Sequence, residues 1–296
     1  MRTILFEKIH KAMRERKNIF FLTAGVGFNL VEPMFAEFPT RTQNVGIAEQ
    51  NLVGIAAGLS NVGFKVICYS YTNFLAERAL EQIRNDICLH RYAPILLGTT
   101  TGFDNAGLGA THHALDDIGV LKSLPHISIF SPSSNESMAA VIETALDSSE
   151  ASFIRFTKSE FAEGKPVTHI NRFLIRNTSP ILIISHGKMA HASRDAAKIA
   201  DVCVFAMDKL KPLDEQTTKN LLSKYSHIVV VEDNFKSGLF NSLCEFAALH
   251  GLTPRLHSLS PREEYIGEIG DAGYFEDRHG LTPEKISAFC NTLSSC

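Results

Sequence analysis

The chain has 296 residues, of which 45% are hydrophobic, and its formal net charge is −3. This length and composition suffice for two domains of about 100–200 residues, each with its own core. The slightly acidic charge argues against a general nucleic-acid-binding surface. No apolar run approaches the roughly 18 residues that a membrane-spanning helix needs.

The N-terminal stretch of residues 1–17 is polar and amphipathic, and it lacks the apolar core of a signal peptide. Its basic residues leave a transit peptide open as an alternative, although Glu7 and Glu15 interrupt that pattern. The six cysteines are scattered without a C-x-x-C pair, which favours reduced thiols over a disulfide framework or a zinc site. A cytoplasmic location is therefore predicted. The cysteines are Cys68, Cys88, Cys203, Cys244, Cys290 and Cys296.

Short β-branched or aromatic runs alternate with helical patterns along the whole chain. This alternation predicts two consecutive α/β domains, each with a mostly parallel sheet covered by helices on both faces in three layers. The predicted boundaries are 1–160 and 178–296, with a linker over 161–177 that contains Gly164-Lys165-Pro166. Predicted strands of the first domain are 19–23, 65–70, 94–100, 126–130 and 152–156, with helices at 74–90 and 134–147. Those of the second domain are 181–185, 202–207, 227–231 and 255–259.

The segment Gly46-Ile47-Ala48-Glu49-Gln50-Asn51 carries one acidic residue between a strand-like run at 41–45 and a small-residue helix at 52–59. It resembles the pyrimidine-domain signature of the transketolase family, whose enzymes use thiamine diphosphate. The resemblance implies that Glu49 is buried against the N1′ nitrogen of the cofactor's aminopyrimidine ring and acts in catalysis. A carboxyl group there can share a proton with the ring. The alternative is an exposed carboxylate that interacts with the dipole of the following helix.

Two further features follow this segment. Gly54 and Gly58 allow close helix packing, and the resemblance favours a contact between two copies of the chain there. Phe74 stands just beyond the strand 65–70, where open α/β sheets bind ligands, and the resemblance implies that its ring stacks on the pyrimidine. A core phenylalanine is the alternative. Arg78 and Arg84, on the same helix, are predicted to be ion-pair or interface residues rather than ligands.

A glycine-rich loop over 101–113 ends in His112 and His113. This loop is interpreted as a flexible arm that presents both imidazoles, and His112 and His113 are predicted to act together on the substrate, because imidazoles exchange protons near neutral pH. His112 resembles the family's loop histidine, which implies contact with substrate oxygens and a role in catalysis. A structural or metal-binding pair is the alternative for the two histidines. Leu108 stands where mainstream relatives carry an aspartate that recognises a substrate hydroxyl. Because leucine accepts no hydrogen bond, an altered or deoxygenated sugar is expected at this position.

Two positions near residue 158 could bind a substrate phosphate. Relatives often carry Arg-x-x-Arg here, whereas this chain has Arg155 followed by Lys158. Lysine binds phosphate as a point charge without the bidentate fork of arginine, so a phosphorylated substrate stays open. An interface salt bridge is the alternative for Arg155.

The resemblance implies that such enzymes bind Mg²⁺ and the diphosphate through Gly-Asp-Gly followed by an asparagine. This chain has no such pair, and Gly270-Asp271-Ala272-Gly273 is interpreted as a loop. The cofactor's diphosphate and Mg²⁺ are therefore expected on a partner N-terminal subunit, and no metal ligand is assigned to this chain. The second half resembles the family's C-terminal domain.

The sequence thus predicts the C-terminal subunit of a split transketolase-like enzyme in an α₂β₂ assembly. It would transfer a two-carbon ketol unit from a ketose to an aldehyde, with a sugar substrate and neither nucleic acid nor membrane as partner. Two alternatives remain: the β subunit of a 2-oxo acid dehydrogenase and a non-catalytic assembly paralogue.

Overall fold

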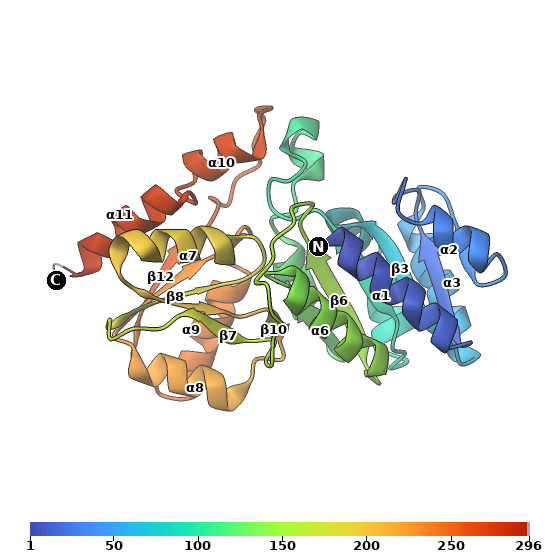
Figure 1. The fold of residues 1–296 in the computed structure, drawn as a ribbon, viewed down its shortest axis with the longest axis horizontal. Coiled ribbons are helices and arrows are strands. Elements are labelled where there is room, and N and C mark those ends of the chain that lie inside the picture. Colours follow the sequence, from blue (N-terminus) through green and yellow to red (C-terminus); the bar gives the residue numbers. More distant parts are fainter. Residues whose placement is uncertain (295–296) are drawn as a thin grey trace. The chain divides into compact units, whose positions relative to one another are not determined.

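The computed structural model describes residues 1–294. The chain divides into two compact units, which are treated separately below (Figure 1). Unit 1 consists of Met1–Thr100 and Val120–Thr168, and unit 2 of Thr101–Gly119 and His169–Cys296. The loop predicted to carry the two histidines therefore groups with unit 2, although it lies in sequence between two strands of unit 1. Cys296 lies outside the described residues.

Unit 1 is built on a parallel sheet with the strand order β5-β6-β4-β3-β1-β2. Its central strands are continuous apolar runs, as expected of parallel strands buried on both faces; every residue of β4 and β6 is buried. The strands are β1 (Ile19–Thr23), β2 (Thr42–Asn44), β3 (Lys65–Tyr71), β4 (Ile95–Thr99), β5 (Ile127–Phe130) and β6 (Ala151–Phe156).

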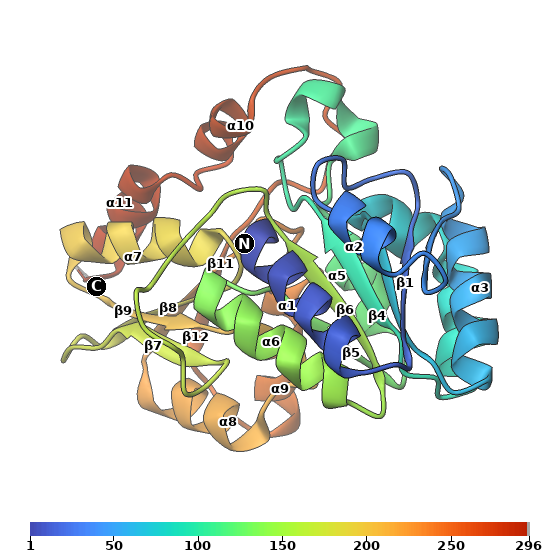
Figure 2. The same ribbon diagram turned by 45° about the vertical axis from the view of Figure 1, so that its right-hand side comes forward.

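The helices of unit 1 pack their apolar faces onto this sheet. Helices α1 and α6 lie side by side (Figures 1 and 2), and α3 packs on β3 and β1. A capping box, in which Ser134 and Ser137 exchange hydrogen bonds, starts α6. The helices are α1 (Arg2–Glu15), α2 (Glu32–Glu37), α3 (Glu49–Asn61), η1 (Phe74–Arg78), α4 (Leu80–Gln82), η2 (Ile83–Cys88), α5 (Asp117–Lys122), which continues from unit 2, and α6 (Asn135–Asp147).

Unit 2 contains a sheet with the order β12-β11-β8-β9-β7, in which only β7 runs antiparallel. Figure 1 shows α7 and α11 on one side of this sheet and α8 on the other. The strands are β7 (Arg172–Ile175), β8 (Ile181–Ser185), β9 (Cys203–Ala206), β10 (Lys209–Lys211), β11 (His227–Val231) and β12 (Arg255–Leu259). The helices are η3 (Ala106–Leu108), η4 (Ala110–His112), α7 (Met189–Ala200), α8 (Glu215–Lys224), α9 (Leu239–Leu249), α10 (Ala272–Arg278) and α11 (Pro283–Ser294).

The predicted fold class, α/β with mostly parallel sheets, is confirmed, and each predicted strand has a counterpart. Some elements differ from the prediction, and one of them, strand β10, was not predicted at all. Strand β7 lies inside the range 161–177 that was expected to be only a linker. The helix expected over 74–90 contains two π-helical turns, η1 and η2. The boundaries 1–160 and 178–296 remain a prediction, and they differ from the two units in the placement of residues 101–119.

Candidate active site

The carboxylate of Glu49 is positioned by a tight turn between β2 and α3. The Oδ1 atom of Asn44 accepts hydrogen bonds from the backbone N–H of Gly25 at 3.1 Å and of Gly46 at 3.0 Å. Gly46 has φ +77°, a conformation that side-chain-bearing residues rarely adopt. Glu49 then opens α3 with only 1% of its surface exposed. This burial excludes the alternative of an exposed helix-end carboxylate.

Both oxygens of the Glu49 carboxylate have protein partners. The hydroxyl of Ser70, on β3, donates to Oε1 at 2.8 Å, and Nη1 of Arg78 donates to Oε2 at 2.5 Å. Charge-assisted hydrogen bonds of this kind are the strong ones. The ion-pair role predicted for Arg78 is thereby confirmed, while its partner was not predicted. The sequence analysis did not identify Ser70 as a site residue. Its position near the carboxyl end of β3, shortly before Phe74, could have indicated this role.

The ring of Phe74 lies next to this pair. The Cζ atom of Arg78 stands 4.5 Å from the centroid of the Phe74 ring, a cation–π contact, and Tyr71 meets the same ring edge-on at 5.8 Å. Phe74 is half-buried rather than a fully buried core residue. The structure thus brings the predicted cofactor residues Glu49 and Phe74 together, with one guanidinium touching both.

The two predicted phosphate-binding residues of unit 1 differ in their access to solvent. Arg155 belongs to β6 and is fully buried, whereas Lys158 follows the strand and is exposed. Of the two side chains, only that of Lys158 is exposed to solvent. Phosphate binding by either residue remains a prediction.

In unit 2, the segment 101–119 is fastened to the elements around it by backbone and side-chain contacts. Gly102 and Ala114 form an antiparallel bridge, and the N–H of Phe235 donates to the carbonyl of Leu115 at 2.5 Å. The amide of Asn234 donates to the carboxylate of Asp117 at 2.7 Å. The predicted flexible arm is therefore tied to unit 2 at its base.

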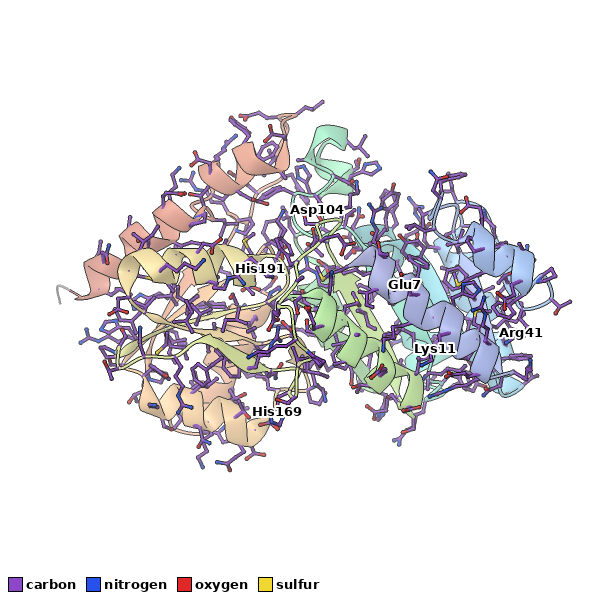
Figure 3. All side chains as sticks on the ribbon, in the orientation of Figure 1. Glu7, Lys11, Arg41, Asp104, His169 and His191 are labelled. Atoms are coloured by element: carbon purple, nitrogen blue, oxygen red, sulfur yellow. The ribbon has the colours of Figure 1, made fainter. Side chains whose placement is uncertain are left out.

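A buried ion network holds the same segment. Lys188, which precedes α7, pairs with Asp104 at 3.1 Å and with Glu276 of α10; Figure 3 labels Asp104. Burial acts to lower the pKa of Lys188, but the carboxylates of Asp104 and Glu276 outweigh it and raise that pKa. Burial raises the pKa of Glu276, and the positive charge of Lys188 offsets only part of this increase. The two shifts are compatible because Asp233 adds a further negative charge to the cluster.

The close approach of the loop to this network requires a glycine. Gly102 has φ +52°, and a Cβ atom there would come within 2.7 Å of the Cβ of Asp233. A larger residue at position 102 would push the loop away from the segment that follows β11, because a Cβ atom is fixed to the backbone and cannot rotate out of the way.

The two histidines that were predicted to act together differ in their exposure to solvent. Leu108 is 58% exposed in η3. His112 is partly exposed in η4, where its Nδ1 lies 3.1 Å from the hydroxyl of Thr111. His113 is 6% exposed, and its ring packs edge-on against Phe103 and Phe275. The apolar neighbours explain the difference, since η4 ends at His112 and turns the next side chain into the core of unit 2.

The burial of His113 predicts a pH-dependent stability. Burial lowers the pKa of His113, and that of His279, which stacks on Phe103, below the usual 6.5. The unfolded chain therefore binds more protons just below pH 6.5, so stability is full above that pH and is lost as the pH falls through the folded-state pKa. His113→Phe is expected to reduce the loss of stability between pH 7.5 and 5.5, because phenylalanine has no group to protonate.

Urea denaturation at the two pH values measures this effect. His90→Phe is the matched control, because His90 is exposed in unit 1, where its ring stacks on Tyr92. An unchanged pH dependence in His113→Phe would contradict the prediction.

Other candidate sites are few in residues 1–294. No group of three or more His, Cys, Asp or Glu side chains is arranged to hold a metal ion there. None of those helices combines the length and apolar character needed to cross a bilayer. Asp271, in the Gly270-Asp271-Ala272-Gly273 segment, caps α10 by accepting from the N–H of Tyr274 at 2.7 Å. The five described cysteines form no disulfide with one another, and burial raises the pKa of Cys290 to about 11.

Comparison with known proteins identifies related chains. Two family models match: the transketolase pyrimidine binding domain over residues 1–163 and the transketolase C-terminal domain over residues 174–286. An apulose-4-phosphate transketolase subunit of Actinobacillus succinogenes is 30% identical over 270 residues, which cover 86% of this chain and 86% of that protein. A 1-deoxy-D-xylulose-5-phosphate synthase of Myxococcus xanthus is 32% identical over 265 residues, covering 85% of this chain but 44% of that protein.

The similar solved structures, like the similar sequences, include a chain of comparable length and one that is about twice as long. A split-gene transketolase, described as an inactive β4 tetramer, has a TM-score of 0.85 at 25% identity and covers 98% of this chain and 96% of its own. The transketolase from Leishmania mexicana has a TM-score of 0.84 at 17% identity, covering 99% of this chain and 45% of its own, and so supports the fold alone. The chain spans less than half of these longer relatives and most of the shorter ones.

Proposed function

This chain belongs to the transketolase family, and on that premise we propose that it is the C-terminal, cofactor-activating subunit of a split enzyme that transfers a two-carbon ketol unit from a ketose to an aldehyde. The resemblance inferred from the sequence is confirmed by the two family models, and membership implies dependence on thiamine diphosphate. The single observation that supports the catalytic role most is the buried carboxylate of Glu49, held between Ser70 and Arg78 and next to the Phe74 ring.

The residues around Glu49 fit the aminopyrimidine ring of the cofactor. They already hold a planar, nitrogen-bearing group, the Arg78 guanidinium, between a carboxylate oxygen and an aromatic ring. A pyrimidine ring has the same two requirements, a hydrogen-bond partner for its ring nitrogen and a flat apolar surface. When bound, thiamine diphosphate would supply the carbanion nucleophile that such a ketol transfer needs.

The chain's own residues would prepare and guide that chemistry. Glu49 would hold or share a proton at the ring nitrogen, and Phe74 would orient the ring by stacking. His112, partly exposed in η4, would hold substrate oxygens or move a proton, and His113 would support the loop from within the core. Leu108, which accepts no hydrogen bond, would favour a sugar that lacks a hydroxyl at the facing position.

A phosphorylated substrate is supported by the name of one relative, an apulose-4-phosphate transketolase. Exposed Lys158 would contact such a phosphate as a point charge, and Arg155 would do so only after it gains access to the ligand. We propose that the diphosphate and Mg²⁺ are held by a partner subunit in a cytoplasmic α₂β₂ assembly, with contacts between two copies of this chain. Two relatives support this proposal: this chain covers only 44% of the 1-deoxy-D-xylulose-5-phosphate synthase, but 86% of the apulose-4-phosphate transketolase subunit.

Reconstitution tests this proposal against the alternatives. The chain is combined with an N-terminal subunit that carries Gly-Asp-Gly followed by asparagine, and cleavage of ketose phosphates in the presence of an aldose acceptor is measured with thiamine diphosphate and Mg²⁺. Pyruvate with lipoamide is the parallel assay for a 2-oxo acid dehydrogenase. Ketol transfer without lipoamide reduction is expected; the opposite result, or no turnover in either assay, would overturn the proposal.

A further inference from the structure

One side chain makes both contacts that the pyrimidine ring is expected to make. The guanidinium of Arg78 donates to Oε2 of Glu49 at 2.5 Å and has its Cζ 4.5 Å from the centroid of the Phe74 ring. The Arg78 side chain is 42% exposed, whereas Glu49 is 1% exposed. A partly solvated cation therefore covers the buried carboxylate from the outer side.

The carboxylate needs a partner of this kind when no cofactor is bound. A buried carboxylate without a cation or several hydrogen bonds is costly. Ser70 supplies one hydrogen bond, to Oε1, and Arg78 supplies the opposite charge at Oε2. Of these two contacts to the Glu49 carboxylate, only the one from the neutral Ser70 hydroxyl would remain if Arg78 were removed.

The local backbone brings Phe74 and Arg78 into register. They are the first and last residues of η1, a π-helical turn that begins shortly after β3, the strand that carries Ser70. Such turns are rare and occur frequently at functional sites. Residues four apart lie on the same face of a helical turn, so the guanidinium folds back over the ring while it reaches Glu49.

We propose that Arg78 is a placeholder for the cofactor: it occupies the positions of the pyrimidine ring on Glu49 and Phe74 in the cofactor-free chain and moves into solvent when the ring binds. This inference rests on the proposed function, because it requires that Glu49 and Phe74 receive the cofactor. It assigns Arg78 a role beyond that of an ion pair, since the pair must open in every binding event.

Displacement by a ligand has a thermodynamic consequence. The contacts of Arg78 stabilise the cofactor-free chain and are lost when the cofactor binds. The free energy of these contacts is therefore subtracted from the free energy of cofactor binding, which weakens the apparent affinity. Arg78→Met keeps the length of the side chain and removes the charge. It is therefore expected to destabilise the cofactor-free chain and to tighten cofactor binding.

The experiment measures both quantities. Melting of the cofactor-free full chain is expected to drop by about 2–4 °C in Arg78→Met. Calorimetric titration of thiamine diphosphate, at saturating Mg²⁺, into the chain assembled with its N-terminal subunit is expected to give a Kd about tenfold lower than that of the wild type, or about 1.4 kcal/mol. Arg84→Met is the control, because Arg84 is exposed and its Nη1 donates to the neighbouring Asn85 at 2.7 Å, away from Glu49. Arg78→Lys, which keeps the charge but loses the planar fork, should bind with intermediate affinity.

The outcomes separate this inference from the proposed function. A wild-type complex that binds the cofactor, with Arg78→Met binding equally or more weakly, overturns the inference alone; weaker binding would mean that Arg78 contacts the bound cofactor. A wild-type complex that binds no thiamine diphosphate overturns the proposed function, and the inference falls with it. If Arg78→Met does not fold, the comparison of Arg78→Lys with the wild type decides the question in the same way.

Discussion

Glu49→Gln is expected to lower the turnover of the assembled enzyme at saturating cofactor by about 10²–10⁴-fold, the range for loss of an acid–base group. Glutamine has nearly the same volume as glutamate and still accepts a hydrogen bond from Ser70. It cannot share a proton with a ring nitrogen as a carboxyl group does. Arg78 would lose its partner, but its side chain is 42% exposed and can be solvated. The loss should therefore appear in turnover rather than in folding.

The control for this substitution is Glu81→Gln. Glu81 lies in α4, exposed to solvent, and is the same type of residue outside the candidate site. Its turnover should match the wild type, and circular dichroism should show the same fold for both variants. Unchanged turnover in Glu49→Gln would support the non-catalytic assembly paralogue and would overturn the catalytic assignment.

Lys188→Met is expected to lower the free energy of unfolding by about 3–5 kcal/mol, because it leaves carboxylates in the interior of unit 2 without their cation. The side chains of Lys188 and Asp104 are 10% and 7% exposed, and Asp233, next to Gly102, is 1% exposed. Methionine fills the space of the lysine stem but supplies no charge. The Glu276 carboxyl, whose pKa is already raised by burial, would become still harder to ionise.

Urea denaturation at neutral pH measures this effect. Lys198→Met is the matched control, because Lys198 lies on α7, the helix that Lys188 precedes, and pairs with Asp195 at the surface. Surface pairs contribute about 0–1 kcal/mol. A loss below 1 kcal/mol in Lys188→Met would contradict a structural role for the network. The substitution should also lower activity, because Asp104 anchors the loop that presents His112.

Much of the fold could be predicted because local sequence and tertiary structure agree. The buried strand β4, for example, is a continuous apolar run with no competing helical period. Strand β7 was not predicted, because it is short, follows a Gly-Lys-Pro segment and is defined by its antiparallel pairing with β9. Edge strands of this kind depend on a partner that is distant in sequence, so local patterns indicate them poorly.

The candidate site shows the same distinction. Glu49 and Phe74 could be named from their motifs, and the structure places one guanidinium against both. The contact itself could not be predicted, because it depends on the packing of η1 against α3 and on the burial of Glu49. The anchoring of the histidine loop by Lys188 and Glu276 joins residues far apart in the chain. The burial of His113 likewise depends on Phe275, which is distant in sequence.

The assignment of residues 101–119 to unit 2 means that the chain passes between the two units three times, after residues 100, 119 and 168. A gene cut at residue 168 would therefore not yield two self-sufficient halves. The first fragment would carry the histidine segment without Lys188, Asn234 and Glu276, and the second would lack the strand-like bridge of Gly102 and Ala114. A break in such a gene at residue 168 would remove contacts that hold unit 2 together. The two units are therefore expected to be inherited together.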